Sequence, residues 1–248
     1  MTALSPAALS LRGVSASYGG AAVLRDIDTD IPSGALSAVV GPNGAGKSTL
    51  IKAALGLVPS SRGTVRFLGQ PLARVRHRVA YVPQQDAVAK DFPITAVQVV
   101  EMGRYPHRGW FRRLRAADDE AVADAMADAG VSDLARMPLD ELSGGQRQRV
   151  FLARALAQHA DVLILDEPFT AVDTRTEAAL LGILRGLCDG GKSVIAVHHD
   201  LRTVSERFDH ATLLAGTVLA SGPAREVLTS AHLERAYGIP LAASRAET

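Results

Sequence analysis

One segment constrains the fold of this chain more than any other, namely Gly41-Pro42-Asn43-Gly44-Ala45-Gly46-Lys47-Ser48. Two glycines stand four residues apart, and Lys and Ser follow the second, which is the spacing of a loop that wraps phosphate groups. Glycines let backbone N–H groups turn toward phosphate oxygens, and a helix beginning near Lys47 would direct its N-terminal donors at the same anion. Lys47 would add a positive charge, and Ser48 a hydroxyl ligand for Mg²⁺. The alternative is an ordinary glycine-rich turn that binds no phosphate.

The surroundings of this loop favour the phosphate-binding interpretation. A short apolar run at 35–40 precedes it, as expected for a buried strand, and a helical pattern continues through Leu57. Further apolar runs at 162–165 and 193–197 enclose a helical pattern at roughly 174–188. This β-α-β order predicts an α/β fold, a P-loop NTPase core with a mostly parallel sheet.

Two other regions are expected to flank that core. Alternating apolar and polar residues at 9–31 predict antiparallel strands, and runs at 64–68 and 78–82 predict further strands. The pattern is helical from Ile94 to Leu134, with Thr95 as a helix cap, a helix at 116–129 and another at 144–159. Short strands at 211–220 and a helix near 224–237 complete the chain. The prediction is one domain over 1–248, with an N-terminal antiparallel β subdomain and a helical subdomain inserted at about 94–160.

Composition excludes several classes of protein. Lys+Arg 27 against Asp+Glu 26 gives a formal charge of +1, which argues against a nucleic-acid binder that depends on bulk charge. A single cysteine, Cys188, cannot form a disulfide framework within the chain and is expected to be a small core residue. No run of 18 apolar residues exists, and the N-terminus does not resemble a signal peptide, so any membrane role is expected to depend on partners.

Two carboxylates follow the apolar run at 162–165. Asp166 and Glu167 would stand at the end of a buried strand, beside the nucleotide crevice of an open α/β sheet. Asp166 is a candidate ligand for Mg²⁺, through water. Glu167 is expected on the opposite face of the strand from Asp166, where it could orient or deprotonate the water that attacks the γ-phosphate. Taken alone the pair is weak evidence, because acidic residues often end strands, but the phosphate loop strengthens it.

A second glycine-containing motif, Leu142-Ser143-Gly144-Gly145-Gln146, precedes the expected helix at 144–159. Ser143 and the two glycine amides would lie at a helix N-terminus, which attracts anions, although a plain helix cap is the alternative. This run resembles the signature motif of ABC-transporter ATPase subunits. The phosphate loop, the signature and the acidic pair stand in the order and at the spacing of that family, and the resemblance covers about Leu9 to Gly238.

The resemblance implies further roles, residue by residue. Tyr18 resembles the aromatic residue that stacks on adenine, and Gln84 the glutamine that contacts Mg²⁺ and responds to the membrane subunit, although Gln85 leaves the register open. Asp173 resembles the aspartate of a dimer-contact loop, with Val172 where Leu is usual, and His199, next to Asp200, the histidine that contacts the γ-phosphate. The catalytic set is Lys47, Glu167 and His199, and the Mg²⁺ set is Ser48, Gln84 and Asp166. The expected ATP contacts are Tyr18, Gly41, Pro42, Asn43, Gly44, Ala45, Gly46, Lys47, Ser48, Thr49, Gln84, Ser143, Gly144, Gly145 and Gln146.

The resemblance also implies partners and a place in the cell. Two copies would face head-to-tail, with each ATP between the phosphate loop of one and the signature of the other. The homodimer would sit on the cytoplasmic face of the membrane as a peripheral subunit beneath a separate permease, served indirectly by an extracellular substrate-binding protein. ATP and Mg²⁺ are the cofactors, the activity is ATP hydrolysis, and no nucleic acid is expected as a partner.

Four stretches are similar to zinc and manganese uptake subunits, namely Asp91–Thr95, Met102–Arg113, Phe151–Gln158 and Pro168–Asp173. Divalent-metal import is therefore expected, without a transition-metal site on this chain, since its seven histidines lack the spacing of zinc ligands. The segment Gly103–His107 is also similar to iron-siderophore and cobalamin importers, which remain an alternative. A soluble ABC-type ATPase is a second alternative, and a kinase or nucleotide-binding regulator that shares the phosphate loop is a third. The basic run at 104–115 is a lipid-facing surface, a permease contact favoured by Trp110 and Phe111, or an ordinary charged helix face.

Overall fold

The computed structural model describes residues 7–18, 21–58, 60–84, 94–108, 114–170 and 173–238. The chain forms two compact units. The first comprises Met1–Arg74 and Ile195–Thr248, and the second comprises Val75–Val194. Several residues named above, including Gln85, Trp110, Phe111 and Val172, lie outside the described residues.

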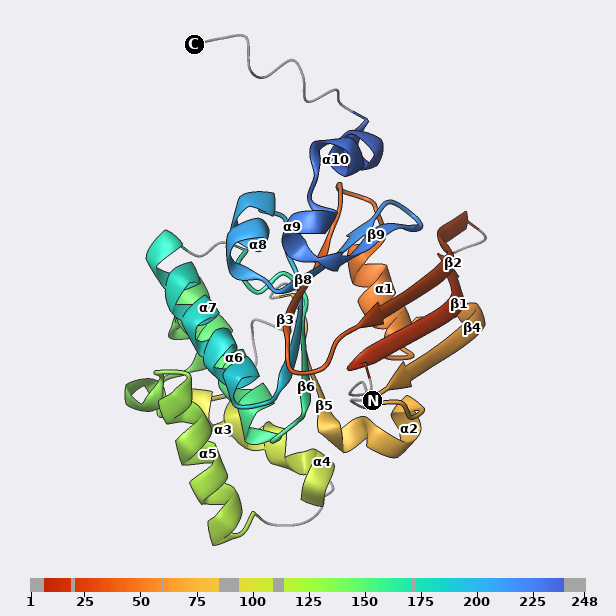
Figure 1. The fold of residues 1–248 in the computed structure, drawn as a ribbon. Helices are drawn as coiled ribbons and strands as arrows, with labels where there is room; N and C mark the ends of the chain where they lie inside the picture. The colour runs from red at the N-terminus through yellow and green to blue at the C-terminus, as the bar shows by residue number, and fades with distance from the viewer. Residues whose placement is uncertain are drawn as a thin grey trace, which may run out of the picture. The chain divides into compact units, whose positions relative to one another are not determined.

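The first unit contains a three-stranded antiparallel sheet of order β2-β1-β4 (Figure 1). These strands are β1 (Leu9–Tyr18), β2 (Ala21–Ile31) and β4 (Ser60–Phe67). Leu9 pairs with Ile31 on one side and with Phe67 on the other, and all three side chains are fully buried. The alternation in the sequence therefore correctly predicted an N-terminal antiparallel sheet, because a sheet with one buried face needs that period of two.

The first unit also carries the strand that leads into the phosphate loop. All five residues of β3 (Leu36–Val40) are buried, and β3 pairs in parallel with β8 (His210–Leu214), which pairs antiparallel with β9 (Val218–Pro223). Ser37 lies opposite His210 in the parallel pair. A strand that is buried throughout reads as one apolar run, so the run at 35–40 was interpreted correctly.

The helices of the first unit differ in detail from the expected ones. They are α1 (Lys47–Ala54), α8 (Leu201–Arg207), α9 (Ala224–Val227) and α10 (Ser230–Tyr237), and the short α2 (Leu72–Val75) ends at the unit boundary. Helix α1 stops before Leu57, because Gly56 adopts a left-handed backbone with φ 69°. The single helix expected at 224–237 is two helices, because the Thr229 hydroxyl accepts a hydrogen bond from His232 N–H and caps a new one.

The second unit places two parallel strands among helices. Strands β5 (Val79–Val82) and β6 (Val162–Leu165) pair in parallel, with Tyr81 opposite Ile164. Its helices are α3 (Ala96–Glu101), α4 (Tyr105–Arg108), α5 (Ala116–Asp128), α6 (Gly144–Ala157) and α7 (Thr174–Asp189), with 3₁₀ turns at Arg76–Arg78, Met102–Arg104, Ser132–Leu134 and Leu139–Glu141. The chain passes from the second unit to the first within β7 (Ser193–Val197), whose five residues are buried.

Residues 94–157 of the second unit are mostly helical, as the sequence predicts. Thr95 begins α3 in a capping box with Gln98, and Gly130, with φ 63°, follows the end of α5. A Cβ at Gly103 would lie 2.2 Å from the Arg154 carbonyl oxygen, so the backbone there packs directly against α6. Cys188 is buried on α7 as a core residue. The division into one domain with an inserted helical subdomain at about 94–160 stays a prediction.

Candidate active site

The phosphate loop follows β3 directly and is shaped by close backbone approaches. A Cβ at Gly41 would lie 2.1 Å from the Leu214 carbonyl oxygen, so no larger residue fits there unless the loop moves. Gly46 has φ 93°, and a Cβ on it would meet Leu24 Cδ2 at 2.7 Å. The loop is therefore a tight backbone cradle on glycines at both ends, as phosphate binding requires.

Lys47 and the start of α1 complete the cradle. Lys47 is 8% exposed, and its Nζ donates hydrogen bonds to the carbonyl oxygens of Gly41 (2.8 Å) and Pro42 (3.0 Å). Gly46 precedes α1 without a side-chain cap, so no side chain of the cap residue competes with an anion for this helix N-terminus. A positive ammonium, a helix N-terminus and the Ser48 hydroxyl thus adjoin one loop, which fits the phosphates of a nucleotide and an accompanying Mg²⁺.

Two other residues of the first unit, His199 and Tyr18, were predicted to contact ATP. His199 has an exposed side chain just after β7, whereas the neighbouring His198 is 1% exposed. The choice of His199 as the residue that reaches a nucleotide is compatible with this difference. Tyr18 is the last residue of β1, and its backbone pairs with Ala21 of β2.

The acidic pair lies just beyond β6 in the second unit. Asp166 is 2% exposed, and its backbone N–H donates to the carbonyl oxygen of Val82 at 2.9 Å. The Tyr81 hydroxyl donates to Asp166 Oδ2 at 3.4 Å. Burial, followed by the negative charge of Asp166, raises the pKa of Tyr81 to about 12, so this hydroxyl stays protonated and remains a donor. The sequence pattern assigned no role to Tyr81.

Glu167 is positioned by its backbone and by two side chains. Strand β6 ends at Leu165, so strand alternation does not extend to Asp166 and Glu167, and Glu167 has a left-handed backbone with φ 52°. The expectation that Glu167 faces away from Asp166 stays a prediction. Its Oε2 accepts hydrogen bonds from Gln84 Nε2 at 3.0 Å and from the Thr170 hydroxyl at 3.2 Å. A strained backbone at a half-exposed carboxylate is typical of a functional position. Thr170 was not foreseen from the sequence.

The signature motif forms the first turn of α6. Ser143 caps this helix, because its Oγ accepts from Gln146 N–H at 3.3 Å and its own N–H donates to Gln146 Oε1 at 2.9 Å. Leu142 is buried immediately before the cap, while Ser143 is exposed. Gly144 and Gly145 occupy the first turn and add no side chains of their own there, which favours the close approach of an anion to this helix N-terminus.

Asp173 also begins a helix. Its Oδ1 accepts from the backbone N–H groups of Arg175 (2.9 Å) and Thr176 (3.0 Å), and its Oδ2 accepts from the Thr176 hydroxyl at 2.8 Å. These bonds, the Thr176 backbone N–H first, lower the pKa of Asp173. Asp173 is therefore a well-anchored cap of α7, and a contact with a second copy stays a prediction for its exposed side.

Comparisons with known proteins show the family to which this chain belongs. The sequence pattern of the ABC transporter family matches residues 24–170, and the chain belongs to that family. As an ATP-binding subunit of this family, it is an ATPase. It is 46% identical to the zinc transport system ATP-binding protein TroB of Treponema pallidum over 93% of this chain and 87% of that protein. It is 45% identical to the manganese transport system ATP-binding protein MntB of Bacillus subtilis, over 93% of this chain and 92% of that one.

Solved structures share the fold. A metal-chelate type ABC transporter in an inward-facing conformation matches with a TM-score of 0.83 and 27% identity, over 94% of this chain and 90% of that one. CbiO1 from Clostridium perfringens, part of an ABC transporter complex, matches with a TM-score of 0.78 and 26% identity, over 96% of each chain. These matches confirm the α/β fold with an N-terminal antiparallel sheet. Among the described residues, no helix is long and apolar enough to cross a membrane.

Proposed function

We propose that this chain is the ATP-hydrolysing subunit that drives import of a divalent metal ion, manganese or zinc, through a separate permease. The observation that carries the proposal is the similarity, at 46% and 45% identity over nearly whole chains, to ATP-binding proteins named for zinc and manganese transport. The likeness to the metal-chelate transporter is lower, at 27%. Iron-siderophore or cobalamin import, and an ATPase unconnected with transport, are therefore less well supported.

In the proposed mechanism, the residues of the sequence motifs supply different groups to the reaction. The glycine loop, Lys47 and Ser48 would bind the phosphates of ATP, and Ser48, Gln84 and Asp166 are the residues that would hold Mg²⁺. Bound Mg²⁺ would neutralise charge on the β- and γ-phosphates. Glu167, whose Oε2 is held by Gln84 and Thr170, would orient or deprotonate the attacking water through its carboxylate. His199, whose side chain is exposed, stabilises the γ-phosphate.

The proposal includes a pair of copies. Ser143 and Gly145 at the N-terminus of α6 would contact the nucleotide bound by the partner copy, and Asp173 would lie in the contact between copies. Closure of the homodimer around two ATP molecules would move the permease, and hydrolysis would reopen the pair. The subunit would act as a peripheral protein on the cytoplasmic face of the membrane, with an extracellular binding protein delivering the metal.

Uptake measurements test the transported substrate. In a strain that lacks this chain, radiolabelled manganese, zinc, siderophore-bound iron and cobalamin are each supplied, and uptake is followed with the wild type or Lys47→Ala restored. We expect manganese or zinc uptake to depend on the wild-type chain and to stay absent with Lys47→Ala. Unchanged manganese and zinc uptake, together with lost uptake of siderophore-bound iron or cobalamin, would replace the metal assignment with the alternative one.

Affinity isolation from native membranes tests the partners separately. We expect the tagged chain to bring down a permease and, with it, a binding protein whose metal site is lined by His and carboxylates. A preparation that hydrolyses ATP but contains no membrane protein would contradict the transport role and leave the ATPase role intact.

A further inference from the structure

The two histidines after β7 have opposite environments, and only the exposed one has been given a role so far. His198 is 1% exposed, while His199 and Asp200 are exposed. A buried imidazole costs free energy unless its nitrogen atoms are satisfied, so its contacts indicate what it does.

The His198 ring closes a turn in the backbone. Its Nδ1 accepts a hydrogen bond from the Asp200 backbone N–H at 3.0 Å, two residues further along the chain. Asn, Asp, Ser and Thr side chains close turns of the same kind, by accepting a hydrogen bond from a nearby backbone N–H. His199 is the residue enclosed by this turn, so the turn determines the direction in which its side chain leaves the backbone.

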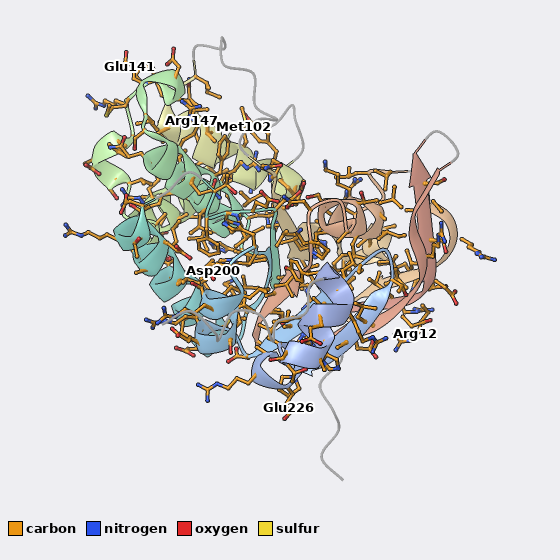
Figure 2. The ribbon with its side chains drawn as sticks, turned by 90° about the horizontal axis from the view of Figure 1, so that it is seen from above. Arg12, Met102, Glu141, Arg147, Asp200 and Glu226 are labelled. Carbon is orange, nitrogen blue, oxygen red and sulfur yellow. The ribbon has the colours of Figure 1, made fainter. Side chains whose placement is uncertain are left out.

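The turn is anchored on both sides. The His198 backbone N–H donates to the carbonyl oxygen of Val39 at 3.1 Å, in the strand that leads into the phosphate loop. Asp200, labelled in Figure 2, caps α8, since its Oδ1 accepts from Arg202 N–H at 2.9 Å and its Oδ2 from the Thr203 hydroxyl at 2.6 Å. The rings of His198 and Phe208, just after α8, are nearly perpendicular, with ring centroids 5.6 Å apart.

The protonation state of the His198 ring allows Nδ1 to accept a hydrogen bond. Burial, and then electrostatic repulsion from the His199 ring, lower the pKa of His198 to about 4, so the ring is neutral near pH 7. With Nδ1 accepting from Asp200 N–H, the single ring proton lies on Nε2.

We propose that His198 is a positioning residue for His199. Its imidazole closes the 198–200 turn and fixes the position of Asp200, which caps α8. The turn also directs the His199 side chain toward solvent. The backbone of His198 is hydrogen-bonded to β3, the strand that leads into the phosphate loop. The inference rests on the proposed role of His199 at the γ-phosphate. It predicts that any side chain at position 198 that can accept the hydrogen bond from Asp200 N–H will support hydrolysis.

Two substitutions separate the acceptor from the bulk of the side chain. In His198→Asn, the side-chain oxygen can replace Nδ1 as the acceptor, whereas His198→Leu fills the site without one. We expect His198→Leu to lower kcat for ATP hydrolysis by at least about tenfold, with KM for ATP within about twofold, because misplacing a catalytic group affects the reacting geometry more than binding. We expect His198→Asn to keep kcat within about threefold of the wild type.

A double-mutant cycle with His199→Ala shows whether His198 acts through His199. In the His199→Ala background, His198→Leu should cause no further loss of kcat, because the residue it positions is already gone. Another histidine of the same unit, His210, provides the matched control, and His210→Leu should leave kcat unchanged. Thermal unfolding of each variant identifies losses that arise from a poorly folded protein.

The inference would be overturned if His198→Leu hydrolysed ATP with the kcat of the wild type. It would equally be overturned if His198→Leu and His199→Ala reduced kcat independently, or if His198→Asn were as impaired as His198→Leu while both remained folded. A His199→Ala variant with full activity would instead contradict the proposed role of His199, and so distinguishes failure of that role from failure of the inference.

Discussion

The side-chain amide of Gln84 donates a hydrogen bond to the carboxylate of Glu167, with 3.0 Å between Nε2 and Oε2. Gln84 follows β5, and Glu167 follows β6, so the parallel pairing of these strands brings the two residues together. The residue expected to respond to the permease thus contacts the residue expected to act on water. This contact gives a direct route by which the state of the permease could affect hydrolysis.

Loss of the Gln84 amide should impair turnover more than ATP binding. Gln84→Ala leaves the Glu167 carboxylate held by Thr170 alone, and we expect kcat to fall about tenfold with ATP affinity little changed. Steady-state hydrolysis and equilibrium binding of ATP measure the two effects. Gln70→Ala, in the turn between β4 and α2, is the control, and equal losses in both variants would contradict this role.

The phosphate loop should not tolerate a methyl group at its first glycine. In Gly41→Ala, the new Cβ must displace either the loop or the Leu214 carbonyl oxygen, 2.1 Å away, and the Gly41 carbonyl that holds Lys47 moves with it. We expect ATP affinity to fall by about tenfold or more, which is a loss of about 1.4 kcal/mol. Gly34→Ala meets nothing within 4 Å but has φ 69°, so it should lower stability by about 1–2 kcal/mol without changing affinity. Wild-type affinity in Gly41→Ala would contradict the cradle geometry.

Removing the carboxylate of the buried Arg104–Asp118 ion pair should strongly destabilise the second unit. Asp118 is fully buried and accepts from Arg104 Nε at 3.0 Å, while Arg104 also donates to the Ala157 carbonyl oxygen at 2.6 Å. Asp118→Ala leaves a buried guanidinium without its carboxylate, and we expect a loss of about 3–5 kcal/mol in the free energy of unfolding.

An exposed ion pair provides the comparison. Arg202 and Glu206 are paired at 3.1 Å on the surface of α8, with side chains 86% and 54% exposed. Glu206→Ala should lower stability by less than about 0.5 kcal/mol, because water and salt already screen that pair. Denaturant unfolding measures the free energy of unfolding of Asp118→Ala and Glu206→Ala. Similar losses in the two variants would contradict the prediction that removing the buried carboxylate costs more.

The buried His198 should make stability depend on pH. Its pKa is about 4 in the folded protein and 6.5 when unperturbed, so the unfolded chain binds more protons between these values. The stability contributed by its neutral form is fully present above about pH 6.5 and is lost as pH falls toward 4. The titratable groups beside it are His199, which lowers the pKa of His198, and Asp200, which raises it. His198→Asn should therefore flatten the pH dependence of the melting temperature in this range, and an unchanged slope would contradict the assignment.

The sequence predicted the parts of the site whose geometry is local. A fixed spacing identifies the phosphate loop and the signature cap, because the hydrogen bonds and close contacts that shape them lie mostly within a few residues. Buried strands such as β3 and β6 were visible as apolar runs bounded by turn residues.

The sequence did not predict features that depend on contacts between distant segments. Tyr81 and Asp166 are 85 positions apart, and only the pairing of β5 with β6 brings them together. The left-handed backbone of Glu167 is held by surrounding structure, which no propensity encodes. The break between α9 and α10 was missed because an apolar pattern continues across Leu228, while the Thr229 cap acts only once the helix ends there.

Hydrolysis and binding of ATP by Glu167→Gln test the central claim most directly. The change keeps the shape of the side chain and its contact with Thr170 but removes the carboxylate charge that would orient or deprotonate water. We expect ATP binding to be retained and kcat to fall by at least about a hundredfold, the scale of general-base contributions. Retained binding with lost turnover would support an ATPase in which Glu167 acts on the attacking water, and wild-type hydrolysis by a folded Glu167→Gln would contradict that account.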